Sequence, residues 1–163
     1  SVSRGLGDVY KRQHSWGHTY LTKLSRQKIK FQMLRTQEKV DALLDCHYPM
    51  QVMRPPMGKT NQKVEESVAA VGYLAVVKWD VSETDPVKAL AAVQNGSILL
   101  FHARKKDAKC LSVLIPQLVA EGYQLVTVSE LLGLPEIVCS AEKYVYHRRD
   151  TEENIRPDAV PQN

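Results

Sequence analysis

Short apolar runs alternate with amphipathic segments along most of this 163-residue chain, and this alternation constrains the fold more than any other feature. An apolar run bounded by turn residues is typical of a strand buried on both faces, whereas apolar residues at helical spacing predict a helix. Strands that alternate with helices run parallel, because a parallel connection needs a crossover long enough to hold a helix. We therefore predict an α/β fold with parallel strands and helical crossovers.

The turn residues set the expected bounds of these elements. Asn61 and Asp85 offer helix caps, while Gly72, Gly96 and Gly122 offer stops. A closed β/α barrel usually needs ~200 residues or more, so we expect a partial barrel. The expected helices cover 25–44, 60–71, 85–93, 107–121 and 129–132, and the expected strands cover 47–54, 73–79, 97–101 and 123–128.

Composition excludes several classes of protein. An apolar content of 44% predicts one domain with a real core. The formal charge of +4 is small, and the basic residues form no stripe with interleaved aromatics, so nucleic acid is not an expected partner. The densest basic cluster inside the body of the chain, 104–106, is expected to be a solvated loop. No run approaches the ~18 apolar residues that a membrane helix needs.

The three cysteines argue against a disulfide framework. Cys46, Cys110 and Cys139 are odd in number, lie far apart in sequence and include no Cys-x-x-Cys pair, which also disfavours a thiolate zinc site. Cys110 lies on the apolar face of a predicted helix, so we expect it in the core.

The two ends differ from the rest of the chain. Residues 1–13 resemble a string found at the ends of unrelated conceptual translations, so we interpret them as a non-native leader that replaces the start of the protein. Residues 14–134 would then be the body of the domain. Residues 135–163 become polar, charged and proline-dotted, which predicts a tail. No secretory signal is visible.

Polar residues with catalytic chemistry stand at the predicted strand ends. Arg54, Asp80 and His102 each fall at or just past such an end, and in parallel β/α folds the catalytic groups gather there. An arginine can hold a carboxylate, and a histidine can move a proton. His14 and His18, four residues apart, would share one face of a helix and give two ligands to one cation.

Each candidate also has a purely structural interpretation. The histidine pair is as easily a pair of surface residues, and a histidine after a buried strand is more often a satisfied core group. Ser15 could support the loop by hydrogen bonding or cap a helix. Trp16 could lie beside a bound sugar or cover the core, and Leu100 could line the site or fill the interior. The order of the motifs along the chain favours the catalytic interpretation.

That order resembles one family. The histidine pair, Arg54-Pro55-Pro56, Trp79-Asp80 and Leu100-x-His102 are similar to the later motifs of the NodB-type polysaccharide deacetylases, which are carbohydrate esterase family 4. The similarity runs from His14 to about Leu132, and the Pro-Pro-Met-Gly turn resembles the branch that acts on bacterial peptidoglycan.

The resemblance implies a partial distorted (β/α) barrel that removes acetyl groups from N-acetylated sugars. It assigns a divalent metal, zinc as the expected ion, to His14 and His18. Arg54 would orient the base carboxylate, and His102 would protonate the leaving amine. The remaining assignments are a Met57 N–H for the oxyanion, Leu100 in the acetyl pocket, Trp16 at the sugar, and Ser15, Asp80 and Asp85 in support.

The chain departs from the family pattern in two places. The Thr-Phe-Asp-Asp-Gly motif, which supplies the base and the third metal ligand, is absent, and no Asp-Asp pair occurs anywhere. Ser82 replaces the aspartate that tunes the acid histidine, and Pro86 replaces a groove tryptophan. Asp85 matches, and Asp80 is a candidate substitute for the tuning aspartate.

We therefore predict an extracellular or cell-wall hydrolase acting on carbon–nitrogen bonds other than peptide bonds, with an acetylated polysaccharide, peptidoglycan or chitin-like, as its partner. Without the base motif, the 163-residue chain itself is expected to be nearly inactive. One alternative is a non-catalytic carbohydrate-binding protein of the same fold. Another is an ordinary α/β domain in which the histidines are incidental and lie apart.

Overall fold

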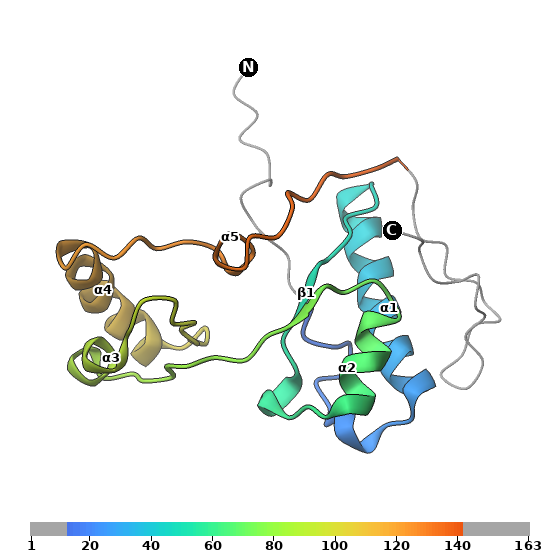
Figure 1. The fold of residues 1–163 in the computed structure, drawn as a ribbon, viewed down its shortest axis with the longest axis horizontal. Coiled ribbons are helices and arrows are strands. Elements are labelled where there is room, and N and C mark those ends of the chain that lie inside the picture. Colours follow the sequence, from blue (N-terminus) through green and yellow to red (C-terminus); the bar gives the residue numbers. More distant parts are fainter. Residues whose placement is uncertain (1–12, 142–163) are drawn as a thin grey trace. The chain divides into compact units, whose positions relative to one another are not determined.

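The computed structural model describes residues 13–141, and these residues form two compact units (Figure 1). The first unit holds the chain as far as Val77 and the segment that starts at Pro135. The second unit is Lys78–Leu134. Both units mix helices with parallel backbone pairing, as the sequence predicts.

The first unit carries two helices and a short parallel sheet. The helices are α1 (Arg26–Leu44) and α2 (Gln62–Ala69), and the strands are β1 (Val52–Met53) and β2 (Ala75–Val76). β1 pairs with β2 in parallel, and Gln13 forms a further parallel bridge with Met53. The unit also holds two 3₁₀ turns, Leu21–Lys23 and Pro56–Gly58.

Side-chain caps fix where the two helices begin. The Ser25 hydroxyl accepts a hydrogen bond from the Lys28 N–H (3.3 Å), and the Asn61 amide oxygen accepts one from the Val64 N–H (3.1 Å). Each bond satisfies an N–H that has no acceptor within the first helical turn. α1 ends at Asp45, whose φ of 55° takes the backbone out of the helix.

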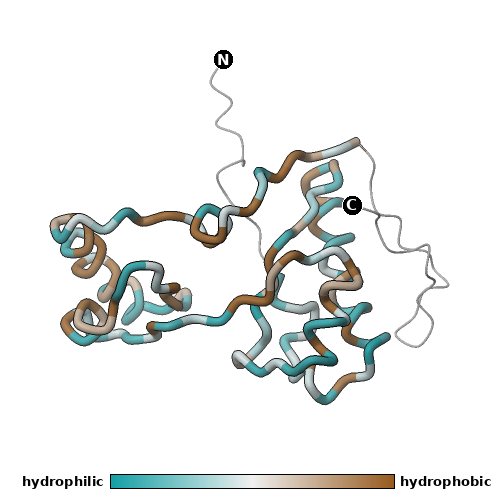
Figure 2. The backbone as a smooth tube through the Cα atoms, viewed as in Figure 1, coloured by the Kyte–Doolittle hydropathy of each residue, from teal (hydrophilic) through white to brown (hydrophobic). Residues whose placement is uncertain are grey.

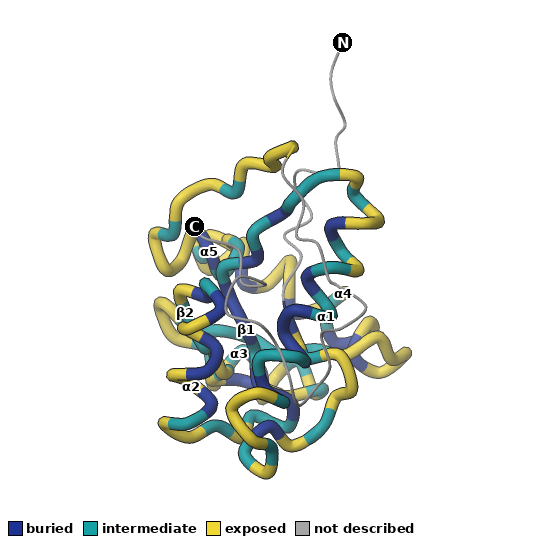
Figure 3. Tube along the Cα trace, turned by 90° about the vertical axis from the view of Figure 1, so that its right-hand side faces the viewer, coloured by how far each residue is buried: buried dark blue, intermediate teal, exposed yellow. Residues whose placement is uncertain are grey.

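A single apolar cluster closes the first unit. Figure 3 shows the buried residues gathered along β1 and on the neighbouring sides of α1 and α2. Ile29 and Met33 of α1, Met53 of β1 and Val64 of α2 are fully buried there, with Leu21 beneath them. Apolar residues of α1 and α2 therefore pack in one cluster with β1.

The second unit consists of α3 (Pro86–Ala92), α4 (Lys105–Ala120) and α5 (Val128–Leu131). Its parallel pairing is the bridge between Val81 and Leu99. α3 packs against α4. The buried cluster is smaller than that of the first unit and contains Val81, Ala89, Cys110, Leu114 and Leu118. Cys110 is thus a core residue, as expected.

Three strand predictions are wrong in extent, and one is wrong outright. The strands expected over 47–54 and 73–79 are each two residues long, and the strand over 97–101 is reduced to the bridge at Leu99. Residues 123–127 form no strand at all. A strand needs a neighbour for its backbone groups, and no described residue pairs with this segment.

The apolar side chains of α4 are only partly buried. Cys110, Leu114 and Leu118 are buried, whereas Ile115 and Val119 are 43% and 58% exposed. In Figure 2 both α4 and α5 carry hydrophobic stretches. The basic cluster expected to be a loop is partly helical, because Lys105 and Lys106 form the first turn of α4.

The ends of the described region belong to the fold. Gln13, the last residue of the expected leader, is fully buried, and its side chain donates to the Met33 carbonyl (3.0 Å) and to the Tyr73 hydroxyl (2.9 Å). Residues 1–12 lie outside the described residues. Of the expected tail, Pro135–Ala141 is described and contacts the first unit. Across residues 13–141, no helix is both long and apolar enough to span a membrane.

Candidate functional site

The histidine pair lies on a bent loop rather than on a helix. The φ angles of Ser15 and His18 are 64° and 46°, in the left-handed region that side chains other than glycine adopt only at a cost. The prediction that His14 and His18 share one face of a helix is therefore wrong. The bend nevertheless brings the two rings together, with centroids 4.8 Å apart in an edge-to-face arrangement.

A backbone carbonyl fixes the orientation of His14. Its Nδ1 lies 2.7 Å from the Arg54 carbonyl oxygen, which can only accept, so Nδ1 carries the proton and donates. The neutral ring then presents the lone pair of Nε2. A histidine that donates one ring N–H to a carbonyl while the other nitrogen stays available is the arrangement found in metal-binding histidines.

α1 holds the histidine loop in place. The Gly17 N–H donates to the Gln32 side-chain oxygen (2.7 Å), and the Arg35 guanidinium lies 5.5 Å from the centre of the Trp16 ring. Trp16 is 50% exposed, so it does not serve as a core residue. The Ser15 hydroxyl is buried and meets no hydrogen-bond partner among residues 13–141, so it neither caps a helix nor braces the loop by a bond described here.

The Arg-Pro-Pro segment forms a rigid turn directly after β1. Pro55 and Pro56 are buried, and Met57 adopts a φ of 53° inside the 3₁₀ turn. As an early residue of that turn, Met57 has an N–H without an acceptor inside the helix. The backbone of Arg54, just before this turn, is bonded to the start of the histidine loop. Its N–H donates to the Gln13 carbonyl (2.9 Å), and its carbonyl accepts from His14.

His102 belongs to the second unit, where it meets Arg104 and Asp107. Its side chain is 54% exposed, so the interpretation as a buried core histidine is wrong. Arg104 Nη2 lies 3.0 Å from His102 Nδ1, and a guanidinium can only donate. Nδ1 therefore accepts, and the proton of the neutral ring lies on Nε2.

Asp107 holds this arrangement together. Its carboxylate is 1% exposed and accepts from the His102 backbone N–H (3.0 Å), from Arg104 Nε (2.8 Å) and from Arg104 Nη2 (3.2 Å). The Arg104 guanidinium, followed by the His102 N–H, lowers the pKa of Asp107 to about 2. The carboxylate therefore stays ionised at neutral pH.

The other candidates of the second unit have backbone roles. Asp80 accepts from the Ile98 N–H (2.7 Å), and Asp85 caps α3 by accepting from the N–H groups of Val87 (2.9 Å) and Lys88 (3.2 Å). Leu100 is half-buried and donates its N–H to the Val81 carbonyl (2.8 Å). The acidic residue beside His102 is thus Asp107, and not the Asp80 that the sequence suggested.

The structure brings together the candidates within each unit. His14, His18, Arg54 and Met57 form one group in the first unit, and His102 has its partners in the second. Sequence reasoning missed Arg104 and Asp107. The sequence did offer a signal, because Arg104 and Asp107 follow His102 by only two and five residues. An acidic residue in the first turn of a helix is well placed to accept hydrogen bonds from the residues just before that helix. No cluster of three or more histidine, cysteine or acidic side chains suited to a metal occurs within residues 13–141.

Comparisons with known proteins point to one family. The family described as polysaccharide deacetylase matches residues 7–76. The peptidoglycan-N-acetylglucosamine deacetylase PgdA of Listeria monocytogenes is 35% identical over 131 residues, which are 74% of this chain and 27% of that protein. The peptidoglycan-N-acetylmuramic acid deacetylase PdaC of Bacillus subtilis is 29% identical over 128 residues, which are 72% of this chain and 26% of that protein.

Solved structures agree. The structure of PdaC from Bacillus subtilis matches with a TM-score of 0.60 at 28% identity, over 74% of this chain and 61% of that chain. The CE4 family pseudoenzyme BA3943 of Bacillus anthracis matches with a TM-score of 0.65 at 23% identity, over 73% and 44%. These similarities confirm the predicted fold class. The chain spans about a quarter of the length of the two curated relatives.

Proposed function

This chain belongs to the NodB-type polysaccharide deacetylases, and on that premise we propose that its residues serve the metal-dependent removal of N-acetyl groups from a polysaccharide. One observation carries the proposal. The His14 and His18 rings lie 4.8 Å apart, and the Arg54 carbonyl holds His14 so that Nε2 is available. Surface histidines without a ligand have no need of such an arrangement.

His14 and His18 are the proposed holders of a divalent cation, with zinc as the expected ion. Two adjacent imidazoles are ligands that zinc prefers, and the carbonyl behind His14 makes that ring a stronger ligand. When bound, the ion supplies Lewis acidity, which polarises the acetamide carbonyl and makes water more acidic. A complete site needs a third protein ligand, which the family takes from the Asp-Asp motif that this chain lacks.

The turn after β1 is proposed to hold the two negatively charged groups of the reaction, the base carboxylate and the developing oxyanion. Arg54 orients the carboxylate of the catalytic base, because a guanidinium binds a carboxylate through two parallel hydrogen bonds. The Met57 N–H stabilises the oxyanion that develops on the acetyl oxygen, since it lacks an acceptor inside its own turn. Both groups are rigid because two buried prolines precede Met57.

His102 is the proposed general acid. As the carbon–oxygen bond to water forms and the carbon–nitrogen bond breaks, the leaving sugar amine needs a proton. His102 would deliver that proton from Nε2, the nitrogen that Arg104 leaves free, and would do so as the imidazolium, which becomes the neutral ring after the transfer. Leu100 would line the acetyl pocket and Trp16 the sugar-binding surface. Asp80 and Asp85 act in support through the backbone bonds described above, and Ser15 would support the site through the bend that its backbone gives the histidine loop.

Peptidoglycan is the proposed substrate class. PgdA and PdaC are named as deacetylases of its two N-acetylated sugars, and PgdA is the relative that is 35% identical to this chain. A chitin-like polymer presents the same acetamide. Acting on peptidoglycan places the protein outside the cell or in the cell wall.

A second function, carbohydrate binding without catalysis, is favoured by two observations. The chain contains no Asp-Asp pair, and Ser82 stands where the family has its tuning aspartate. The fold also occurs in a protein described as a pseudoenzyme.

Zinc titration tests the proposed metal ligands. Zinc at a hundred times its dissociation constant should stabilise the chain by ~2.7 kcal/mol, which a thermal unfolding curve resolves. His14→Ala and His18→Ala should lose that effect, whereas His102→Ala should keep it. Equal zinc stabilisation in all four proteins would refute the histidine pair as a site.

Acetate release from N-acetylated chito-oligosaccharide distinguishes the enzyme from the binding protein. The chain itself should release acetate only at background, because it lacks the base. A chimera that places the Asp-Asp-bearing segment of PgdA before this chain should release acetate, and His102→Ala in the chimera should abolish the release. Binding of the oligosaccharide without release by the chimera would favour the second function, and turnover by the chain alone would overturn the assigned base.

A further inference from the structure

The segment Pro135–Ala141 is tied to the first unit by three contacts. The Gln51 side chain donates to the Pro135 carbonyl (2.9 Å), and Ile137 packs against the apolar cluster. His47 and Ser140 exchange two backbone hydrogen bonds, of 2.9 and 3.1 Å, as an isolated antiparallel bridge. The chain therefore returns to the first unit after completing the second.

This bridge places two cysteines side by side. Cys46 precedes His47 and Cys139 precedes Ser140, so the two cysteines are diagonal neighbours on the face opposite to the bridged pair. The neighbouring Cys139 thiol, followed by burial and by the carboxylates of Asp41 and Asp45, raises the pKa of Cys46 to about 11.

We propose that Cys46 and Cys139 form a disulfide that fastens Pro135–Ala141 to the first unit. The sequence argued against any disulfide because the cysteines are odd in number and far apart. The structure accounts for both points, since the fold brings residues 46 and 139 together and leaves Cys110 buried in the core of the second unit.

The proposed oxidant is a small-molecule disulfide such as oxidised glutathione. Cys139 is exposed, so its thiolate attacks first, which forms a mixed disulfide and releases one glutathione thiolate. The Cys46 sulfur then displaces the second glutathione, and the two protons lost by the cysteines end on the two released thiols. Cys46 reacts second because it keeps its proton at neutral pH.

The cross-link would close a ring that contains the whole second unit, Lys78–Leu134. A disulfide that closes a long ring removes much conformational freedom from the unfolded chain, although geometric strain often reduces the gain. We expect the oxidised chain to unfold roughly 5–15 °C above the reduced chain. This inference is independent of the proposed hydrolysis.

Peptide mapping of the 163-residue chain tests the proposal. The chain is equilibrated with oxidised glutathione, alkylated and cleaved after glutamate, because trypsin leaves Cys110 and Cys139 in one peptide, whereas cleavage at Glu121, Glu130 and Glu136 separates them. The expected product joins the Cys46 and Cys139 peptides, with two hydrogens fewer than their sum, and leaves Cys110 alkylated. Cys110→Ala should give the same product.

Thermal unfolding of the oxidised and reduced forms completes the test. Cys139→Ser changes an exposed residue, so it should fold and lose the difference in unfolding temperature between the two forms. Three alkylated cysteines after oxidation, a link to Cys110, cross-linked dimers alone or a mixed disulfide that goes no further would each overturn the proposal.

Discussion

The two units differ in how they satisfy their interior. In the first unit, parallel strands pair and the buried carboxylate of Asp41 is fully bonded, although the Ser15 hydroxyl is buried without a partner among residues 13–141. Asp41, 1% exposed, accepts from Gln37 Nε2 (2.7 Å) and from the Tyr48 N–H (3.0 Å), and it lies 2.7 Å from His47 Nδ1. An interior of this kind tolerates little change, because each group relies on its neighbours.

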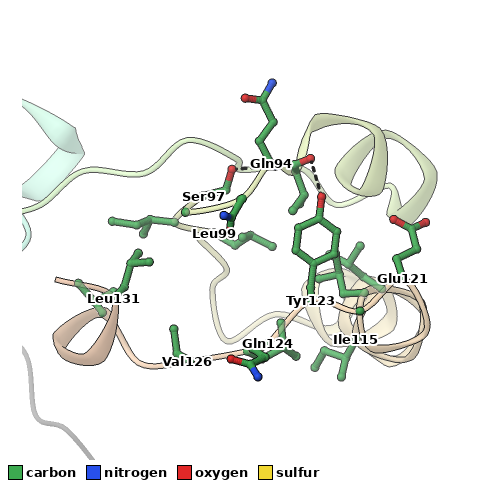
Figure 4. Close-up of a pocket in the computed structure, with 18 of the residues that line it drawn as sticks. Gln94, Ser97, Leu99, Ile115, Glu121, Tyr123, Gln124, Val126 and Leu131 are labelled. Atoms are coloured by element: carbon green, nitrogen blue, oxygen red, sulfur yellow. Dashed lines mark hydrogen bonds between the residues drawn. The ribbon is translucent and has the colours of Figure 1, made fainter. Parts of the chain in front are cut away.

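The second unit leaves part of its apolar surface open. A groove of about 700 Å³ is lined by residues 93–99 and 101, by α4 and by the segment that follows α4 (Figure 4). Leu99, Ile115, Tyr123 and Val126 line this groove, and Val126 is 51% exposed. The Tyr123 hydroxyl donates to the Val93 carbonyl (3.4 Å), which is the polar contact drawn across the groove between segments distant in sequence.

The difference shows what strand pairing contributes to such a fold. Both units have helices that bury apolar residues in a core. The first unit adds a paired sheet for the helices to cover. In the second unit, residues 123–127 have no partner strand among the described residues, so Leu125 and Val126 stay exposed and Tyr123 is only half-buried.

The largest expected effect comes from truncating one leucine in each core. Leu21 and Leu114 are both fully buried, but Leu114 also lines the groove of the second unit. Leu21→Ala should leave a closed cavity and cost ~4 kcal/mol, whereas Leu114→Ala should open onto the groove and cost ~2 kcal/mol. Chemical denaturation measures both.

Each unit contains one tryptophan, Trp16 in the first and Trp79 in the second, so fluorescence assigns the loss to a unit. Trp16→Phe leaves a probe for the second unit, and Trp79→Phe leaves one for the first. Equal costs for the two leucine substitutions would contradict the comparison, since they would mean that both cores are equally closed.

The next effect concerns the buried carboxylate of the first unit. Asp41→Asn keeps the size of the side chain but replaces one acceptor oxygen with a donor that faces other donors. We expect a loss of ~2–3 kcal/mol, the usual cost of an unsatisfied buried polar group. Glu65→Gln, an exposed carboxylate on α2 in the same unit, is the matched control and should change stability by less than ~0.5 kcal/mol. A small effect at Asp41 would show that this interior adapts.

Much of the fold could be predicted from the sequence, because helix signals are local. The caps at Asn61 and Asp85 and the spacing of apolar residues in α1 and α4 placed four helices within a few residues of their observed bounds. Strand extent could not be predicted in the same way, because it depends on a partner. The run from Tyr123 to Val128 has a strand's composition, but composition does not supply the neighbouring backbone.

The candidate site divides along the same line. The residue types and their order along the chain suggested His14, His18, Arg54 and His102, because choosing these candidates requires no knowledge of their positions in space. The bent loop that brings the His14 and His18 rings together could not be predicted, since it depends on left-handed backbone at Ser15 and His18. The link from Asp107 through Arg104 to His102 was also missed, because it appears only once α4 begins at Lys105.

The smallest expected effect is a pH dependence confined to the second unit. The Arg104 guanidinium, followed by the His102 N–H, lowers the pKa of Asp107 from 3.8 to about 2. A carboxyl whose pKa is lower in the folded state stabilises the fold fully above its unfolded pKa, and that stabilisation disappears as the pH falls through the folded pKa. The stabilisation by Asp107 should therefore be present above about pH 4 and lost between about pH 4 and pH 2.

Unfolding of the Trp16→Phe protein, followed through Trp79, reports this change in the second unit. With Asp107→Asn added, the unfolding temperature should fall by a few degrees at pH 6, and the gap should close as the pH approaches 2. A gap that stays constant from pH 6 to pH 2 would show that Asp107 acts through the shape of its hydrogen bonds and not through its charge. In that case the ionised carboxylate could no longer be what keeps Arg104 at the His102 ring.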